Sequence, residues 1–453
     1  MSKSRKKINV LFVAFVASIG GFLFGFDLSV IGAANLYLRE QFNLTEAQFG
    51  FATASASIGC IFGPFLGSWL CDYIGRKKTM IFSSILLAVS AIFTAIANDM
   101  FIFNVFRIVG GVGIGLCSVA SPMYIAEIAP ARRRGSLGVM YQLAIILGSI
   151  IAPLVAYFLA KYLDGSVCWR WMFFSEMASI AIFVLFLFFL PKSPRWLAER
   201  GEYDQAFDIL ERIENTEHAR IEMDAIKSSL SVETGKLSEI IQPGLRYALF
   251  IGIMLAFFNN WTGWSVMGGY IPMLFEMSGL EERAVSILQF AITYGFMGIM
   301  GIVSILIIDR VGRKPMWIVA SFGMAIVTGL TGLVFHFQLS GIIVLLVLLL
   351  CAMPHGLALG PLPWLMMSEI FPTKIRAKAV AVTTAFLWVM IFTAAYLFPV
   401  LTRLSEKTIG SVAGVFWLFT LICIISALFG FKVLPETKGK TLEQISELLK
   451  RKK

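Results

Sequence analysis

The chain has 453 residues, of which 58% are hydrophobic and only 15% are charged, and its mean hydropathy is +0.81. Soluble domains carry about 25% charged residues, so this composition excludes a soluble enzyme with a single membrane anchor. The net charge of +10 is divided among short loops, which argues against a nucleic-acid-binding face.

Long apolar stretches recur along the whole chain, and each is long enough to cross a bilayer as a helix. Six precede and six follow a polar segment at 191–245; they lie at 9–34, 47–71, 79–99, 101–128, 136–162, 170–190, 246–275, 284–308, 315–337, 341–370, 377–402 and 409–434. The first is too long for a signal peptide and lacks a small-residue cleavage site. We therefore predict an all-α membrane protein of twelve transmembrane helices. Its predicted parts are a six-helix bundle at 1–190, a cytoplasmic linker at 191–245, a second bundle at 246–434 and a cytoplasmic tail at 435–453.

The first apolar stretch holds a carboxylate, Asp27, within GGFLFGFDLSV. A charge in the middle of a membrane helix costs about 2.5–3.5 kcal/mol, so it indicates a charged partner, a water-filled cavity or a function. Arg107, near the start of the fourth stretch, is the partner that we expect.

Lysine and arginine gather in alternate loops. They precede the first helix and follow the second, fourth, eighth and tenth, as Lys3, Arg5, Lys6, Lys7, Arg76, Lys77, Lys78, Arg132, Arg133, Arg134, Arg310, Arg313, Lys314, Lys374, Arg376 and Lys378. The other loops carry only scattered basic residues. This asymmetry predicts that both termini and the linker are cytoplasmic.

Two charged motifs occur once in each half. D-x-x-G-R-K follows the second and eighth helices, and E-I-x-P-x-x-x-R ends the fourth and tenth. Such a repeat indicates two halves that rock about a site near the bilayer midplane. We expect the charges to form a cytoplasmic cluster that latches the halves in an outward-open state and breaks in an inward-open one; the alternative is that they only anchor the topology. The residues are Asp72, Arg76, Glu127, Arg134, Asp309, Arg313, Glu369 and Arg376.

The linker contains GEYDQAFDILERI, in which Phe207, Leu210 and Ile213 are three apart. This pattern predicts short amphipathic helices that brace the bundle, with a partner-binding platform as the alternative. The six cysteines have no disulfide or metal spacing, and we expect them to be small buried residues. Gly59, Gly63 and Gly67 are spaced for close helix packing within one bundle, which needs no dimer.

Taken together, the motifs resemble the sugar porter family of the major facilitator superfamily. The matches run in order through GGFLFGFD, the two D-x-x-G-R-K copies, Arg107, PMYIAEIAPARRRG, WRWMF, PKSPRWL, GPLPW and PETKGKTLE. The resemblance implies the family fold, alternating access, and monosaccharides or related polyols as substrates. It also implies that Asp27 carries a proton and that Arg107 modulates it, because proton-coupled members have an Asp and an Arg at these two positions. A static ion pair in an uncoupled facilitator is the alternative.

The resemblance further implies a sugar site. Phe24, Gln142 and Ser149 occupy family positions in the first half, and Trp364, Trp388 and His355 do so in the second. The seventh helix departs from the family pattern: Asn259 and Asn260 replace two glutamines, Ser265 replaces an asparagine, and Gly269 replaces the first tyrosine of a gating pair. Leu387 stands where an amide is common, and Lys192 replaces an acid that would join the cytoplasmic cluster.

These observations predict a proton-coupled importer of a hexose or a pentose. An inositol or polyol symporter and an uncoupled sugar facilitator are the alternatives, and a non-transporting sensor is a remote one because such sensors usually carry long cytoplasmic tails. We expect no cofactor, no metal site and no enzymatic activity, and a monomer in a bacterial inner membrane whose partners are the sugar, the proton and the bilayer.

Overall fold

The computed structural model describes residues 7–130, 132–230, 237–242, 245–279, 282–372, 374–440 and 444–445. Within these residues all regular structure is helical. Lys3, Arg5 and Lys6, and most of the predicted tail beyond residue 440, lie outside them.

The first bundle comprises α1 (Val10–Gln41), α2 (Glu46–Ile74), α3 (Arg76–Ile96), α4 (Met100–Ile128), α5 (Arg134–Tyr162), α6 (Gly165–Phe174) and α7 (Glu176–Leu187). The linker forms α8 (Pro194–Glu199), α9 (Tyr203–Ile213), α10 (Thr216–Leu230) and the 3-10 helix η1 (Leu237–Ile241). The second bundle comprises α11 (Arg246–Trp261), α12 (Trp264–Gly268), α13 (Ile271–Met277), α14 (Arg283–Val311), α15 (Arg313–His336), α16 (Ile342–Pro354), the π-helix η2 (His355–Leu359), α17 (Pro361–Glu369), α18 (Arg376–Ile409) and α19 (Ala413–Lys432).

Eleven helices in the described residues are long and apolar enough to cross a membrane, with α6–α7 and α16–η2–α17 each counted as one. The seventh apolar stretch of the sequence is instead broken into α11, α12 and α13. The break falls at Gly263, whose φ of 112° is open to glycine and strained for other residues. Irregular backbone at membrane depth is tolerated where it lies inside the protein, and Trp264 beside the break is buried.

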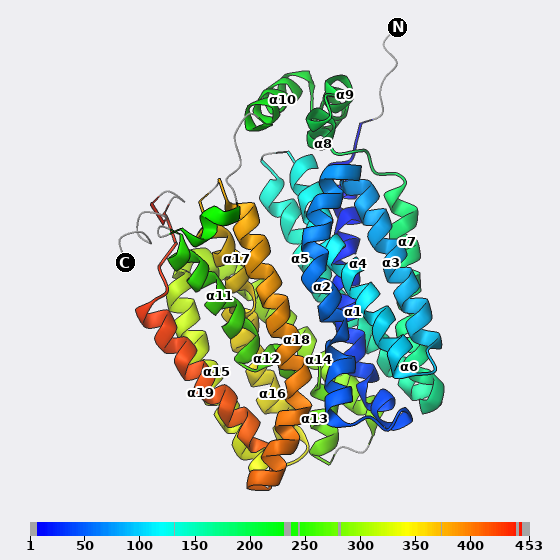
Figure 1. Cartoon of the computed structure of the whole chain (residues 1–453), viewed down its shortest axis with the longest axis vertical. Helices are drawn as coiled ribbons and strands as arrows, with labels where there is room; N and C mark the ends of the chain where they lie inside the picture. Colours follow the sequence, from blue (N-terminus) through cyan, green and yellow to red (C-terminus); the bar gives the residue numbers. More distant parts are fainter. Residues whose placement is uncertain are drawn as a thin grey trace.

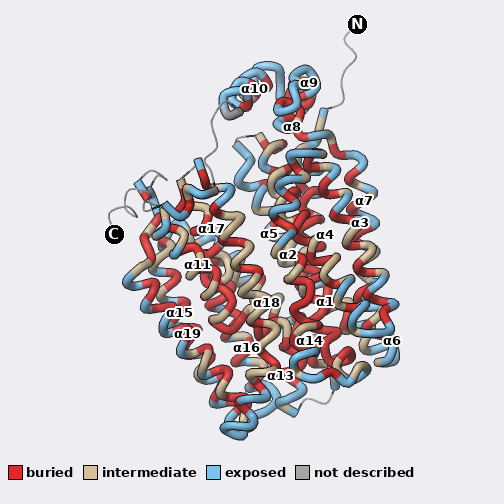
Figure 2. Tube along the Cα trace, in the orientation of Figure 1, coloured by how far each residue is buried: buried red, intermediate tan, exposed pale blue. Residues whose placement is uncertain are grey.

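Figure 1 shows the two bundles side by side, with both chain ends at the same end of the molecule. We call this the proximal end and the opposite one the distal end. The bundles meet where α2 packs on α18 and α5 packs on α14. The linker helices α8–α10 lie over the proximal end of the first bundle, and buried residues run through the middle of both bundles (Figures 1 and 2).

Glycines set the closest helix contacts of the first bundle. A Cβ on Gly63 of α2 would overlap the Cα of Gly115 of α4, and one on Gly59 would overlap the backbone of α4 at Ile108. The glycine spacing predicted from the sequence therefore serves packing within one bundle. The six cysteines are all free and buried, as predicted.

The linker helices form a small apolar core of their own. Ala206, Ile209 and Leu210 of α9 are buried in it, and Phe207 and Ile213 pack against its edge. The backbone N–H of Ile8 donates to the Arg212 carbonyl at 2.9 Å, so the start of the described chain lies against α9. The described part of 191–245 thus contains short helices, and one face of α9 is apolar and buried.

Candidate functional site

Asp27 of α1 and Arg107 of α4 form an ion pair in the interior of the first bundle. Arg107 Nη1 contacts Asp27 Oδ1, and its Nη2 donates to the Asp27 carbonyl at 3.4 Å. Only 1% of Asp27 and 2% of Arg107 is exposed. The Arg107 guanidinium also lies over the Phe173 ring, 5.3 Å from its centroid. Buried charges of this kind require pairing, and the structure supplies it.

A third charged group, Glu176, lies beside this pair and was missed by the sequence reasoning. It is the first residue of α7 and is 3% exposed, and the charges of Asp27 and Arg107 both act on it. Three atoms of the cluster are buried without a hydrogen-bond partner: Asp27 Oδ2, Arg107 Nε and Glu176 Oε1. The signal was available, because Glu176 is a carboxylate inside the apolar stretch 170–190.

Two aromatic residues predicted for the sugar site face each other across the two bundles. The rings of Phe24 in α1 and Trp388 in α18 meet edge to face, with centroids 5.9 Å apart. Trp388 is 1% exposed, whereas Phe24 is partly exposed. Gln142 of α5 is exposed, which leaves its amide open to a ligand.

Ser149 occupies a different kind of position from the one expected. Its hydroxyl donates to the Ile145 carbonyl at 3.0 Å and approaches the Gly25 carbonyl at 3.3 Å, and the residue is 8% exposed. The hydroxyl proton is therefore engaged by backbone where α5 packs on α1. In this conformation the Ser149 hydroxyl serves helix packing, and the sugar contact that the sequence suggested stays a prediction.

The two asparagines of α11, Asn259 and Asn260, are both buried, but their amides donate to different backbone carbonyls. Asn259 Nδ2 donates to the carbonyls of Leu359 at 2.7 Å and Gly360 at 3.2 Å, so it ties α11 to the irregular end of η2. Ser265 in turn donates to the Asn259 carbonyl at 3.1 Å. Asn260 Nδ2 donates to the Ala256 carbonyl at 3.0 Å, and its Oδ1 is buried without a partner.

His355 and Trp364 flank the irregular segment between α16 and α17. His355 begins the π-helix η2 and is 9% exposed, with Nδ1 buried and unpartnered and its ring 6.2 Å from the Trp264 ring. Trp364 lies on α17 and is 44% exposed. Short π-helical segments occur frequently at functional sites, and this one places an accessible tryptophan after a buried histidine.

The repeated charged motifs form two matching clusters at the proximal end. Arg76 Nη2 pairs with Glu127 at 2.7 Å, and Ser193 Oγ donates to the same carboxylate at 2.6 Å. In the second bundle Arg313 Nη2 pairs with Glu369 at 3.0 Å, and Thr437 Oγ1 donates to it at 2.6 Å. Each arginine also pairs with the aspartate of its own motif, Asp72 at 3.7 Å or Asp309 at 3.0 Å.

Each of these clusters closes within its own bundle, and Arg134 does not join one. Arg134 Nη2 pairs with Glu222 of α10 at 2.8 Å, because α5 begins beneath the linker helices. Arg376 Nε donates to the Phe371 carbonyl at 3.3 Å, and the residue makes further interactions. In this conformation the arginine–glutamate pairs of the motifs join helices of one half rather than the two halves.

The two clusters differ at one position. Glu436 accepts hydrogen bonds from the backbone N–H groups of Arg313 and Lys314, both at 3.1 Å, and so caps the N-terminus of α15. The matching residue before Ser193 is Lys192, which is exposed and lies with Nζ 5.8 Å from the Trp196 ring centroid. The first turn of α3 has no side-chain cap. The acid missing at 192 is therefore a helix cap.

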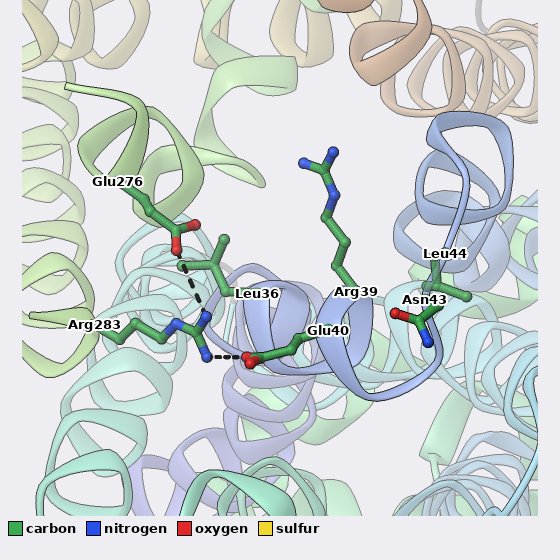
Figure 3. Close-up of a pocket in the computed structure, with 7 residues that line it drawn as sticks. All are labelled: Leu36, Arg39, Glu40, Asn43, Leu44, Glu276 and Arg283. Carbon is green, nitrogen blue, oxygen red and sulfur yellow. Dashed lines mark hydrogen bonds and ion pairs between the residues drawn. The ribbon is translucent and has the colours of Figure 1, made fainter. Parts of the chain in front are cut away.

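At the distal end the bundles are joined by polar contacts. Asn35 Nδ2 of α1 donates to the Gly269 carbonyl at 2.9 Å. Arg283 of α14 pairs with Glu40 of α1 at 2.5 Å and lies 3.6 Å from Glu276 (Figure 3). The three residues of these ion pairs line a pocket of about 450 Å³, whose full lining is Leu36, Arg39, Glu40, Asn43, Leu44, Glu276 and Arg283.

A family profile described as sugar (and other) transporter matches residues 13–449. The chain belongs to the sugar porter family of the major facilitator superfamily. This sugar porter is a multi-pass membrane transporter and not an enzyme. It is similar to the arabinose-proton symporter of Bacillus subtilis (strain 168), with 37% identity over 456 residues that cover 99% of this chain and 97% of that protein. It is also similar to the D-xylose-proton symporter of Escherichia coli (strain K12), with 35% identity over 467 residues that cover 96% and 95%.

Solved structures support the predicted fold. The inward-open conformation of the xylose transporter XylE from E. coli gives a TM-score of 0.85 at 32% identity and covers 97% of this chain and 100% of that one. XylE bound to 6-bromo-6-deoxy-D-glucose gives 0.78 at 33% identity and covers 97% and 99%. The major facilitator fold is therefore confirmed.

Proposed function

We propose that this sugar porter is a symporter that imports a monosaccharide, either a hexose or a pentose, together with a proton. The observation that carries the proposal is the buried Asp27–Arg107 pair. Its support comes from relatives whose names are arabinose-, D-xylose- and galactose-proton symporter, at 37%, 35% and 31% identity. The uptake experiment described below identifies which sugar is transported.

The pair offers a direct means of carrying a proton. Deprotonated Asp27 is neutralised by Arg107, so the empty carrier holds no unpaired charge there. Protonation of Asp27 removes the attraction, and Arg107 then needs another counter-ion inside the membrane. Glu176 is the carboxylate beside it. Proton uptake thus changes the contacts that join α1, α4 and α7.

The energy available is sufficient for uptake against a gradient. One charge that moves through 100 mV releases about 2.3 kcal/mol. Since a tenfold ratio corresponds to about 1.4 kcal/mol, one proton supports roughly fiftyfold accumulation of a neutral sugar.

The proposed sugar site lies between the bundles. Phe24, Trp388 and Trp364 supply apolar faces on which a sugar ring packs, and Gln142 supplies an open amide. Asn260 adds a buried carbonyl oxygen without a partner. Asn259, Ser265 and His355 shape the wall behind them, and Ser149 holds α5 against α1.

One observation favours a polyol such as inositol as the second candidate. The Asn259 amide nitrogen is already committed to two backbone carbonyls, and an aliphatic residue, Leu387, replaces an amide on α18. Fewer donors remain in the second bundle than in the family pattern. An uncoupled facilitator and a sensor are the remaining alternatives.

We also propose that the proximal end is cytoplasmic, in a bacterial inner membrane, and that the transporter acts as a monomer. The basic residues Lys77, Lys78, Arg310 and Lys314 lie at that end, as the positive-inside rule requires.

The test is uptake of a panel of labelled hexoses, pentoses and inositol into proteoliposomes, with and without an inward proton gradient. Accumulation of one solute only under the gradient supports symport and identifies the substrate. Equilibration without accumulation would replace symport by facilitation. Binding without any flux would favour the sensor, and the absence of both would exclude every substrate on the panel.

A further inference from the structure

The two bundles are held together at the distal end by a set of groups that we call the distal seam. Its members are Asn35, Glu40, Glu46 and Thr53 of the first bundle, and Gly269, Arg283 and Arg403 of the second. Glu40 pairs with Arg283 at 2.5 Å, and Arg403 Nη1 lies 3.8 Å from Glu46. The seam contains no member of the Asp27 cluster or the proposed sugar site.

The distal seam has a buried core, Asn35 and Thr53, and an exposed rim of ion pairs. The side chain of Glu40 is 67% exposed and that of Arg403 57%, so water screens these ion pairs and each contributes little. Asn35 is 1% exposed and Thr53 is 9% exposed. A buried hydrogen bond is the costlier one to lose, because its polar groups are left unsatisfied.

The Asn35 amide is satisfied on both sides in this conformation. Its Nδ2 donates to the Gly269 carbonyl at 2.9 Å. Its Oδ1 lies 3.1 Å from Thr53 Oγ1, whose single proton is shared between this oxygen and the Phe49 carbonyl at 3.0 Å. The Thr53 hydroxyl belongs to the same bundle and fixes the orientation of the amide. Asn35 therefore presents a preorganised donor to the partner bundle.

Gly32 allows the close approach because it has no side chain. A Cβ on Gly32 of α1 would already lie 3.3 Å from the Gly269 carbonyl, so the backbones of α1 and the α12–α13 junction approach closely. The neighbouring Tyr270 ring packs on Phe49 of α2, with centroids 5.5 Å apart. The contact between the bundles is thus a hydrogen bond from the Asn35 side chain to the Gly269 backbone carbonyl, with the Phe49–Tyr270 ring pair beside it.

We propose that Asn35, oriented by Thr53 and bonded to the Gly269 carbonyl, is a catch that holds the distal side closed while the proximal side is open. The ion pairs of the rim add little to its strength. The proposal rests on alternating access as described under the proposed function, in which this bond must break once in every cycle. A catch that consists of one buried hydrogen bond stabilises the distal-closed state, yet it is weak enough to break during each transport cycle.

The test measures the separation of the bundles directly, without substrate. Spin labels on cysteines at Asn43 and Glu282, both exposed, report the distal end, and a second pair at Lys78 and Arg310 reports the proximal end. Distances are measured by pulsed electron paramagnetic resonance in the full-length protein in nanodiscs. Asn35→Ala is expected to raise the ratio of distal-open to distal-closed molecules about five- to tenfold, with shorter proximal distances.

The matched control is Glu40→Gln, which breaks an exposed ion pair of the same seam and is expected to change that ratio by about twofold or less. Thr53→Val keeps the volume of residue 53 and frees the Asn35 amide, so an intermediate shift is expected. This second variant decides the outcome if Asn35→Ala elutes as an aggregate. Unchanged distances in Asn35→Ala or Thr53→Val, or a larger shift in Glu40→Gln, would overturn the proposal.

The same data separate this inference from the proposed function. If no solute on the uptake panel is transported but the distal distances respond to Asn35, the catch stands and the function fails. If proton-driven uptake is found and the distances do not respond, the function stands and the catch fails.

Discussion

At the residue scale the chemistry centres on the buried Asp27–Arg107 ion pair, with Glu176 buried in the same interior. Asp27 forms an ion pair with Arg107. The Oε1 atom of Glu176 is buried without a hydrogen-bond partner. In a low-dielectric interior an arginine always needs a counter-ion. Under the proposed function, Arg107 pairs with Asp27 when Asp27 is deprotonated and needs Glu176 when it is protonated, and each case predicts an effect on transport.

Replacement of Asp27 by asparagine keeps the size of the side chain and removes the site of protonation. We expect Asp27→Asn to lose gradient-driven accumulation, from roughly fiftyfold to about onefold, while exchange of labelled for unlabelled sugar continues. Proteoliposome uptake and counterflow measure the two. Accumulation that survives in the variant would contradict the role of Asp27 as the proton carrier.

Replacement of Glu176 by glutamine removes the counter-ion left for Arg107 when Asp27 is protonated. We expect Glu176→Gln to lower proton-driven uptake at least tenfold, because the proton-loaded state then holds an unpaired buried charge. The matched control is Glu282→Gln, an exposed carboxylate before α14. Equal uptake rates in the two variants would show that Glu176 only packs.

At the element scale the two halves carry the same helix-end devices with one exception. Glu436 accepts from two backbone N–H groups at the start of α15, and Lys192 leaves the start of α3 without such an acceptor. A carboxylate at a helix N-terminus is favourable both as a cap and through the helix dipole. Because α3 and α15 begin in equivalent ways apart from this residue, a carboxylate at position 192 is predicted to stabilise the protein.

We expect Lys192→Glu to stabilise the protein by about 1 kcal/mol, by capping Arg76 and Lys77 as Glu436 caps Arg313 and Lys314. The measurement is thermal unfolding in detergent, where a rise of a few degrees in the midpoint is anticipated. Lys192→Gln separates the removal of the cation from the addition of the cap. No rise with glutamate beyond that with glutamine would refute the capping explanation. If the Lys192→Glu transport rate also stays unchanged, the residue at 192 has no part in the conformational cycle.

The glycines of α2 set the distance between helices. A Cβ on Gly63 would overlap Gly115 of α4, whereas a Cβ on Gly138 of α5 has open space around it. We expect Gly63→Val to lower the yield of folded protein severely and Gly138→Ala to leave it unchanged. Fluorescence-detected size-exclusion chromatography compares them, and a normal elution profile for Gly63→Val would disprove the close-packing argument.

At the scale of the whole molecule the bundles are joined differently at their two ends. α2 and α18 meet at Gly50, where a Cβ would overlap the Tyr396 carbonyl. At the proximal end the arginine–glutamate pairs of the charged motifs stay within each bundle. Contacts between the bundles are thus present at the distal end, and the TM-score is 0.85 to inward-open XylE and 0.78 to XylE with a bound glucose analogue.

We expect Gly50→Val to hold α2 and α18 apart at that point and so to disfavour the distal-closed state. Transport is expected to fall at least tenfold while the protein still binds sugar added at the distal side, because the proposed sugar site is not altered. Binding and flux measured on the same preparation test this. Flux equal to that of the unaltered protein would show that closure does not require contact at Gly50.

The sequence alone determined the membrane class, the two-half plan and the family, because apolar length, loop charge and motif order are properties of linear sequence. It also predicted Asp27 and Arg107, since a charge inside an apolar stretch stands out without any knowledge of packing. Glu176 was overlooked although it too is a carboxylate inside an apolar stretch, and the packing of α7 beside α1 is what brings its helix to that of Asp27.

Only the tertiary structure decided how individual side chains are used. Ser149 and Asn259 have polar groups that suit a sugar, yet Ser149 donates to the Ile145 carbonyl of its own helix where α5 packs on α1, and Asn259 donates to the Leu359 carbonyl at the end of η2. Hydrogen-bond partners are set by which helices come together, and linear spacing does not encode that. The distal seam follows from the same cause, because it joins residues more than two hundred positions apart, such as Asn35 and Gly269.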